Sequence, residues 1–284
     1  MKKSLLFLTI LLLTFEISAQ QKGTLFIIGG GNRTDKIMKK LVLLAGGEKA
    51  KVIVIPNASS DKKGTAEYQI KQFKEFGCTN SDFLFFNKEN ADADSNLSKI
   101  EGAQLIFFSG GDQNKLTQDL LGTKLIDKIK EVYNNGGVIS GTSAGAAVMS
   151  SIMITGEELI NKDSSNYFNS IQAKNIQTAE GFGFVADAVI DQHFIKRKRN
   201  NRLISVVLEN PEKLGIGIDE STAIIIYPDD TFEVTGESQV IVYDATEVDV
   251  KTKNDSNQFS SSLIKMHILT DGQKYDLKKK IIIK

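Results

Sequence analysis

The sequence predicts an α/β protein, in which a doubly wound, mainly parallel β-sheet carries helices on both faces and is followed by an antiparallel extension. Three observations support this fold class. Apolar runs rich in β-branched and aromatic residues alternate with helix-like segments through the first half of the chain. Most of these runs end in glycine, serine or proline. After about residue 215 the pattern changes to short strands separated by turns.

The first half supplies the parallel sheet. Its expected strands are residues 25–28, 52–55, 83–86, 105–108 and 138–139, and the clearest helices between them are residues 36–44, 66–76 and 125–133. The strands are apolar throughout, so both of their faces must be buried, as helices on each side of a parallel sheet allow. Ligands bind beyond the carboxyl ends of such strands, so the turns that follow them are expected to form one functional rim.

The second half supplies one more buried strand and the extension. The buried strand is expected at residues 188–190, and the extension at residues 215–218, 223–227, 231–234, 240–243 and 263–269. We expect these last strands to form an antiparallel meander on the edge of the main sheet. Residues 254–262 are polar and serine-rich, which predicts a mobile loop. Because the sequence has no repeats and no long linker, we expect residues 20–284 to form one domain. Its β-rich extension is expected to cover residues from about 223 to 284.

The N-terminus has the pattern of a secretory signal peptide. Lys2 and Lys3 precede an apolar stretch over residues 5–15, and small residues end the segment at Ala19. Glu16 interrupts the stretch too early for a good membrane span. We therefore expect residues 1–19 to be cleaved and the protein to be exported to the periplasm or beyond, without a stable membrane anchor. An uncleaved N-terminal anchor is the alternative.

The amino-acid composition argues against several kinds of partner and site. The 284 residues carry 35 basic and 35 acidic side chains, so nothing indicates a nucleic-acid partner. The single cysteine, Cys78, excludes an intramolecular disulfide and has no neighbouring histidine to make it a catalytic thiol. Only two histidines are present, and no cysteine pair, so no histidine-based zinc site is expected. No cofactor is expected either, because hydrolysis by a serine nucleophile needs none.

The motif G-T-S-A-G at residues 141–145 is the most informative feature. It follows the apolar run at residues 138–139 and precedes a helix-like segment, which is the context of a nucleophile elbow. In such a turn the Ser143 hydroxyl stands clear of the sheet, and the flanking glycines permit the tight backbone. The motif predicts a serine hydrolase, although small-residue turns also occur for packing alone.

A serine nucleophile needs a base and a carboxylate that orients it. His193 follows the buried strand at residues 188–190 and therefore reaches the same rim as the serine, whereas His267 lies within a strand of the extension. For the acid we favour Glu220, which ends the strand-like G-I-G-I-D-E and follows the histidine in chain order. Asp191, Glu157 and Glu158 remain alternatives.

The oxyanion requires backbone donors aimed at the developing charge. The N–H of Ala144, directly after the serine, is expected to supply one donor. The turn at Gly110-Gly111 is expected to supply the second, assigned to Gly111, although these glycines also suit a tight turn. The run Gly29-Gly30-Gly31 lacks the rest of a phosphate-binding motif and is interpreted as a rim loop.

Three arginines follow the histidine within one short segment: Arg197, Arg199 and Arg202. Such clusters are typical of a solvated helix face. Near a nucleophile, however, several guanidinium groups also suit bidentate capture of substrate carboxylates.

Together these motifs resemble cyanophycinase and its relatives. The resemblance is carried by G-T-S-A-G-A at residues 141–146, G-G-D-Q at 110–113, D-Q-H-F at 191–194 with the arginines after it, and G-I-D-E at 217–220. It extends from residue 29 to about 243. These relatives are serine peptidases of the family that also holds aspartyl dipeptidase, with a fold similar to class I glutamine amidotransferases.

The resemblance implies a triad of Ser143, His193 and Glu220 in an exopeptidase that hydrolyses β-aspartyl-arginine units. It also implies a set of substrate-binding residues: Gln113, Asp191, Gln192, Arg197, Arg199 and Arg202. The three arginines favour cyanophycinase over the aspartyl or isoaspartyl dipeptidase branch.

Two other readings stay open beside this one. An α/β-hydrolase esterase also has an elbow, but it places its acid before its histidine. A secreted binding protein could keep the fold without activity. A peptide is the expected partner, and the sequence leaves a homodimer open.

Overall fold

The computed structural model describes residues 22–160, 168–248, 251–253, 255 and 257–284. The predicted signal peptide, residues 1–19, lies outside the described residues. The predicted α/β class is confirmed, because helices cover both faces of the parallel strands in a mixed nine-stranded sheet. Its strand order is β17-β16-β11-β10-β1-β5-β4-β2-β3.

The nine-stranded sheet has a parallel half and an antiparallel half. The parallel strands are β1 (Thr24–Ile28), β5 (Val138–Thr142), β4 (Leu105–Phe108), β2 (Val52–Ile55) and β3 (Ser81–Phe83). The antiparallel strands are β10 (Thr222–Ile226), β11 (Thr231–Gly236), β16 (Lys274–Asp276) and β17 (Ile281–Ile283). The two halves join where β10 pairs with β1.

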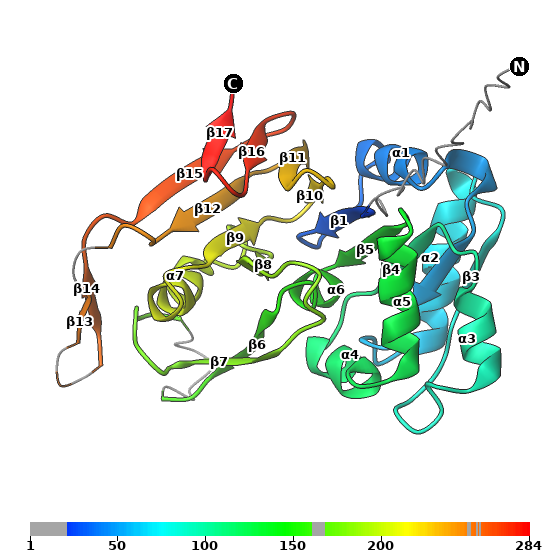
Figure 1. Cartoon of the computed structure of the whole chain (residues 1–284), viewed down its shortest axis with the longest axis horizontal. Helices are drawn as coiled ribbons and strands as arrows, with labels where there is room; N and C mark the ends of the chain where they lie inside the picture. Colours follow the sequence, from blue (N-terminus) through cyan, green and yellow to red (C-terminus); the bar gives the residue numbers. More distant parts are fainter. Residues whose placement is uncertain (1–21, 161–167, 249–250, 254, 256) are drawn as a thin grey trace, which may run out of the picture.

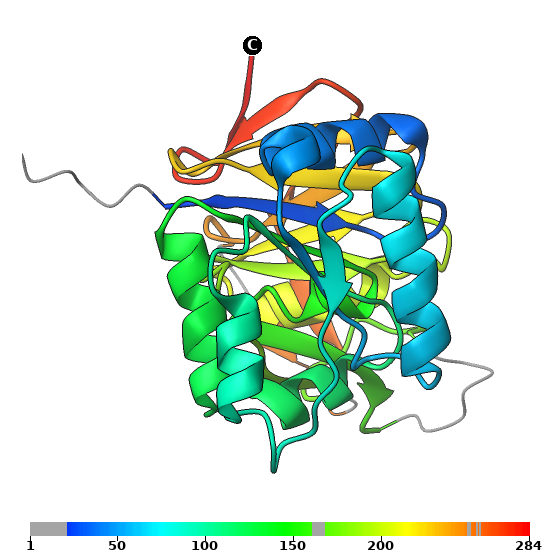
Figure 2. The ribbon, with the colours of Figure 1, turned by 90° about the vertical axis from the view of Figure 1, so that its right-hand side faces the viewer.

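Helices cover both faces of the parallel half, with the sheet between them in the turned view (Figure 2). On one face lie α1 (Asp35–Leu44), the short helix η1 (Gly47–Lys49) and α2 (Lys62–Glu75). On the other lie α3 (Asp94–Ile100), α4 (Gln113–Leu120) and α5 (Lys124–Asn134). Within β1, Phe26 and Ile28 pack toward the first group, whereas Leu25 and Ile27 pack toward the second. This double burial explains why the strand sequences do not alternate.

A second, four-stranded sheet lies beside the first, in the order β15-β12-β9-β8 (Figure 1). It consists of β8 (Ala188–Gln192), β9 (Leu214–Ile218), β12 (Val240–Asp244) and β15 (Lys265–Leu269). Only β8 and β9 run parallel, and α7 (Asn200–Glu209) connects them and packs on β9.

The expected single meander is therefore wrong in its arrangement. The chain after residue 213 contributes β9, β12 and β15 to the second sheet but β10, β11, β16 and β17 to the main one. The physical reason lies in burial, because every residue of β9, β10 and β12 is buried. Strands that are apolar on both faces need cover on both sides, which two packed sheets provide.

The remaining elements are short. Strands β6 (Ile152–Glu158) and β7 (Ile176–Glu180) pair as an antiparallel ribbon. Strands β13 (Lys251–Lys253) and β14 (Phe259–Ser261) form a second such ribbon. Strand β14 falls within residues 254–262, which the sequence had suggested to be a loop. The strand expected at 83–86 is displaced to 81–83, since the chain leaves the sheet after Phe83. Within the described ranges, no helix is both long and apolar enough to cross a membrane.

Candidate active site

Ser143 lies between β5 and α6 (Ala144–Ala147), on the strand-to-helix turn that the motif predicts. Its backbone is strained, with φ 54° and ψ −108°, a conformation that residues other than glycine seldom adopt. The N–H of Ser143 donates to the carbonyl of Ile28 at 3.1 Å, which ties the turn to β1. A Cβ at Gly145 would lie 2.4 Å from the carbonyl oxygen of Phe108, so the helix can approach β4 only with glycine there.

His193 lies directly after β8 and joins the serine to an acid. Its Nε2 is 2.8 Å from Ser143 Oγ, and its Nδ1 is 2.6 Å from Glu220 Oε1. The residue is 7% exposed and has φ 48°. The structure thus brings together the serine, the histidine and the favoured acid in one hydrogen-bonded chain.

The other carboxylates considered for the acid lie elsewhere. Asp191 accepts from the Nε of Arg202 at 2.7 Å and also from its Nη2. Glu158 is buried and accepts from the side-chain amide of Asn175 at 2.7 Å, whereas Glu157 is exposed. Of the four candidates, only Glu220 is bonded to His193 in the described structure.

Asp219, which the sequence analysis did not single out, fixes the acid's position. Its Oδ1 accepts from the backbone N–H of Lys196 at 2.9 Å, and its Oδ2 accepts from the hydroxyl of Ser238 at 2.7 Å. Asp219 therefore ties the end of β9 to the turn that follows His193. Its place directly before Glu220 in G-I-D-E was the available signal.

The electrostatics of the site favour the neutral form of the imidazole. Burial lowers the pKa of His193 below its ordinary value, and the positive charges of Arg197 and Arg199 lower it further. The hydrogen bond and the negative charge of Glu220 act in the opposite direction. The net effect is a lowered pKa, which suits a group that must accept a proton near neutral pH.

Of the residues expected to bind the oxyanion, Ala144 directly follows the serine, and Gly111 belongs to a turn whose Gly110 contacts the serine. Ala144 is the first residue of α6, where an N–H has no partner within the helix. A Cβ at Gly110 would lie 3.3 Å from the Cβ of Ser143, so this glycine lies directly against the nucleophile. Gly111 has φ 137°, and a Cβ there would lie 2.1 Å from the carbonyl oxygen of Ala58. Position 111 therefore requires glycine for its backbone conformation and its packing.

The three arginines occupy different environments, although the sequence grouped them together. Arg202 is 2% exposed and is engaged by Asp191, with its guanidinium 4.8 Å from the ring centroid of Phe168. The Nη1 of Arg199 donates to the backbone and side-chain oxygens of Gln192, both at 2.7 Å. Burial, followed by the charge of Arg202, lowers the pKa of Arg199 to about 10.

Arg197 is the exposed member of the cluster and lies close enough to His193 to influence its pKa. Gln113, at the start of α4, donates its side-chain amide to the carbonyls of Ile154 and Thr155 at 3.0 and 2.6 Å. It thereby joins the oxyanion turn to β6. Of the predicted substrate residues, Arg197 and Arg199 lie close enough to act on His193, and Asp191, Gln192, Arg199, Arg202 and Gln113 already have hydrogen-bond partners.

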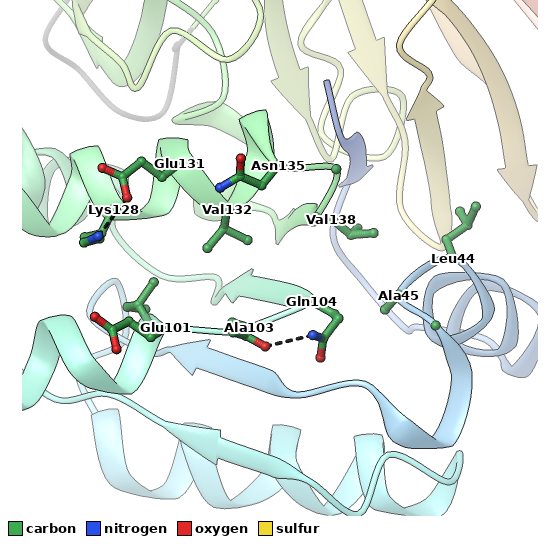
Figure 3. A pocket seen from close by; sticks show the side chains of 15 residues that line it. Leu44, Ala45, Glu101, Ala103, Gln104, Lys128, Glu131, Val132, Asn135 and Val138 are labelled. Carbon is green, nitrogen blue, oxygen red and sulfur yellow. Dashed lines mark hydrogen bonds and ion pairs between the residues drawn. The ribbon is translucent and has the colours of Figure 1, made fainter. Parts of the chain in front are cut away.

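A separate cavity of about 440 Å³ lies at the amino ends of β4 and β5 (Figure 3). Ser143 follows the carboxyl end of β5 and therefore lies at the opposite end of these strands. Lys128 and Glu131 form an ion pair at its margin, 2.8 Å apart. None of its lining residues belongs to the triad. Among the residues that the structure describes, no group of three or more histidine, cysteine, aspartate or glutamate side chains could hold a metal ion.

A serine on a strained strand-to-helix turn of an α/β sheet, bonded to a histidine and an acid, is the arrangement of a serine hydrolase. Comparison with known proteins narrows this class to serine-type peptidases. The profile of peptidase family S51 matches residues 25–234, so the chain belongs to that family.

Relatives and solved structures agree with this membership. Cyanophycinase of Synechococcus elongatus is 33% identical over 270 residues, covering 90% of this chain and 80% of that protein. Peptidase E of Haemophilus influenzae is 35% identical over 136 residues, 45% of this chain and 56% of its own length. The crystal structure of a peptidase from an acI-B1 actinobacterium superposes with a TM-score of 0.63 at 25% identity, covering 91% of this chain and 98% of that one.

Proposed function

We propose that this chain is an exported serine exopeptidase of the cyanophycinase type, which hydrolyses β-aspartyl-arginine units through an acyl-enzyme. One observation carries the proposal, namely the continuous chain from Ser143 Oγ through the His193 ring to Glu220 Oε1, with separations of 2.8 and 2.6 Å. These separations are within reach for proton transfer between nucleophile and base.

In the first step, Ser143 Oγ attacks the carbonyl carbon of the scissile amide while its proton passes to His193 Nε2. The carboxylate of Glu220 accepts the Nδ1–H, which fixes the tautomer and stabilises the imidazolium. The N–H groups of Ala144 and the Gly110-Gly111 turn bind the oxyanion. When the C–N bond breaks, the imidazolium gives its proton to the leaving amine.

In the second step, a water molecule replaces the amine. His193, neutral again, takes a proton from this water as its oxygen attacks the ester carbonyl of the acyl-enzyme. Collapse of the second tetrahedral intermediate breaks the bond to Ser143 Oγ, which recovers its proton from the imidazolium. The cycle requires no cofactor.

The charge around the triad supports an acidic substrate. Three guanidinium groups, of Arg197, Arg199 and Arg202, lie in the segment after His193, whereas the described carboxylates that contact this histidine and these arginines are those of Glu220 and Asp191. Arg197 is exposed and can approach a substrate carboxylate directly. Arg199 and Arg202 would act through their ordered contacts with Gln192 and Asp191. Cyanophycinase relatives that match most of the chain are consistent with a β-aspartyl substrate.

The alternative is an aspartyl or isoaspartyl dipeptidase, which the partial similarity to peptidase E favours. One experiment distinguishes the two. The mature protein is incubated with cyanophycin, with β-aspartyl-arginine peptides and with α-aspartyl dipeptides, and the products are separated by mass. We expect release of dipeptide from cyanophycin by the wild type and none by Ser143→Ala. Cleavage of α-aspartyl dipeptides alone would support the alternative, and binding without turnover would support an inactive binding protein.

A further inference from the structure

The end of β1 and the loop that follows it, residues 28–31, together contact all three segments that carry the triad. The sequence had suggested only a rim loop for the three glycines, residues 29–31. We propose that this loop holds the triad in register, with Gly30 as a positioning residue for the His193 ring. The proposal rests on the proposed serine-peptidase function, but its test can be interpreted separately from that function.

Consecutive carbonyl groups at the end of β1 bind the backbones of the three segments. The carbonyl of Ile28 accepts the backbone N–H of Ser143 at 3.1 Å. The carbonyl of Gly29 accepts the N–H of His193 at 2.7 Å, and the carbonyl of Gly30 accepts the N–H of Ser221 at 2.9 Å. Ser221 directly follows Glu220 in the chain. A single stretch of backbone therefore sets the spacing between nucleophile, base and acid.

The bare Cα atom of Gly30 lies against the face of the imidazole. A Cβ there would lie 2.4 Å from Cε1, 2.5 Å from Nε2 and 2.9 Å from Nδ1 of His193, all well inside van der Waals contact. At Gly31 a Cβ would lie 2.7 Å from the Cβ of Glu220. Any side chain at position 30 must push the ring away, which breaks its alignment between Ser143 and Glu220.

The loop also shields the ring from water without adding charge. The charged groups that influence the imidazole are Glu220, after β9, and Arg197 and Arg199, in the segment after β8. The glycine backbone covers another side of a residue that is only 7% exposed. A change at Gly30 therefore alters the position and hydration of the ring, while its charged neighbours keep their identity.

Gly30→Ala tests the proposal, and Gly46→Ala is its matched control. The two glycines have nearly equal φ values, 107° and 104°, but a Cβ at Gly46 meets nothing within 4 Å. Both substitutions place an alanine at nearly the same positive φ, and only one collides with the imidazole. We expect Gly46→Ala to keep kcat and KM, and Gly30→Ala to lower kcat at least ~100-fold while KM changes by less than about threefold, because misplacement affects reaction more than binding.

A double-mutant cycle with His193→Ala measures the same contact through Tm, without any need for activity. With the histidine present, Gly30→Ala should lower Tm more than Gly46→Ala does. Once the ring is removed, this excess loss from Gly30→Ala should fall sharply, because its Cβ no longer meets the imidazole. If Gly30→Ala does not fold with the histidine present, recovery of folding in the His193→Ala background would also show that the added Cβ collides with the imidazole.

The outcomes separate the two proposals. Wild-type protein that cleaves no aspartyl peptide would refute the proposed function, and the Tm cycle would still test the contact. Active wild-type protein combined with an equally active Gly30→Ala variant would overturn the positioning role. So would an excess Tm loss that does not shrink once the ring is removed.

Discussion

At the scale of single residues, the site depends on two pairs of charged or titratable side chains with different tasks. His193 and Glu220 are bonded at 2.6 Å beside the nucleophile, whereas Asp191 and Arg202 are both at most 2% exposed and engage each other. The first pair aligns a base. The second neutralises two charges that would be very unfavourable alone in the interior.

Removing the charge of Asp191 should therefore affect stability strongly. Asp191→Asn leaves the Arg202 guanidinium buried without a carboxylate, which we expect to cost about 3 kcal/mol of unfolding free energy. Chemical denaturation measures this loss of unfolding free energy. The matched control is Asp35→Asn, which breaks an exposed pair with Lys39 and should leave the midpoint nearly unchanged. Equal midpoints for the two variants would contradict this account of Arg202.

Removing the charge of Glu220 should affect catalysis instead. In Glu220→Gln the amide no longer stabilises the imidazolium, so we expect kcat to fall roughly 10²- to 10⁴-fold with little change in KM. Steady-state kinetics on a β-aspartyl-arginine peptide measures both constants. Full activity in this variant would remove Glu220 from the triad.

The pH dependence follows from the lowered pKa of His193. The base must be unprotonated, so kcat/KM should rise with pH as the imidazole loses its proton and then reach a plateau. Because burial lowers the pKa, this rise should be centred below the ordinary value of about 6.5. Arg197→Gln removes one nearby positive charge and should move the rise to higher pH. A shift to lower pH would contradict the electrostatic account.

At the scale of elements, the first half of the fold could be predicted closely, because each strand is a short apolar run between helix-like segments. β2 and β4 begin and end at the predicted residues. The second half could not be arranged from sequence. Strands β9, β10 and β12 all read as short apolar runs, and nothing in a run indicates which of two sheets it joins.

The site shows the same division. Ser143, His193 and Glu220 each follow a strand, as expected, but β5 belongs to the main sheet, whereas β8 and β9 belong to the second sheet. The pairing of Asp191 with Arg202 could not be foreseen, since it depends on how α7 returns over β8 and β9. The contact of Gly30 with His193 joins residues far apart in the chain and has no local signal.

Glycine in β9 illustrates how an element positions the site. A Cβ at Gly217 would lie 2.3 Å from Cδ1 of Phe194, which is fully buried and directly follows His193. Gly217→Ala should therefore cost roughly 1–3 kcal/mol through overpacking and should also lower kcat. Thermal unfolding together with kinetics measures both effects. An unchanged Tm would show that the ring moves aside freely.

At the scale of the whole molecule, we propose that the N-terminal segment directs export, so that the enzyme meets its substrate outside the cytoplasm. We expect the protein collected from the periplasm or the medium to begin at Gln20, which intact mass and N-terminal sequencing determine. Replacing apolar residues of the segment 5–15 with charged ones should keep the full-length chain inside the cell. Unprocessed protein in the cytoplasm of the native host would contradict the proposal.

The central claim is that Ser143 is a nucleophile activated by His193, and covalent labelling tests it most directly. The mature protein is treated with a serine-directed fluorophosphonate, and the adduct is located by peptide mass mapping. We predict one adduct on the peptide that contains Ser143, absent from Ser143→Ala and formed far more slowly in His193→Ala. An active wild-type protein without an adduct at Ser143, or a Ser143→Ala variant that still hydrolyses the substrate, would contradict the account.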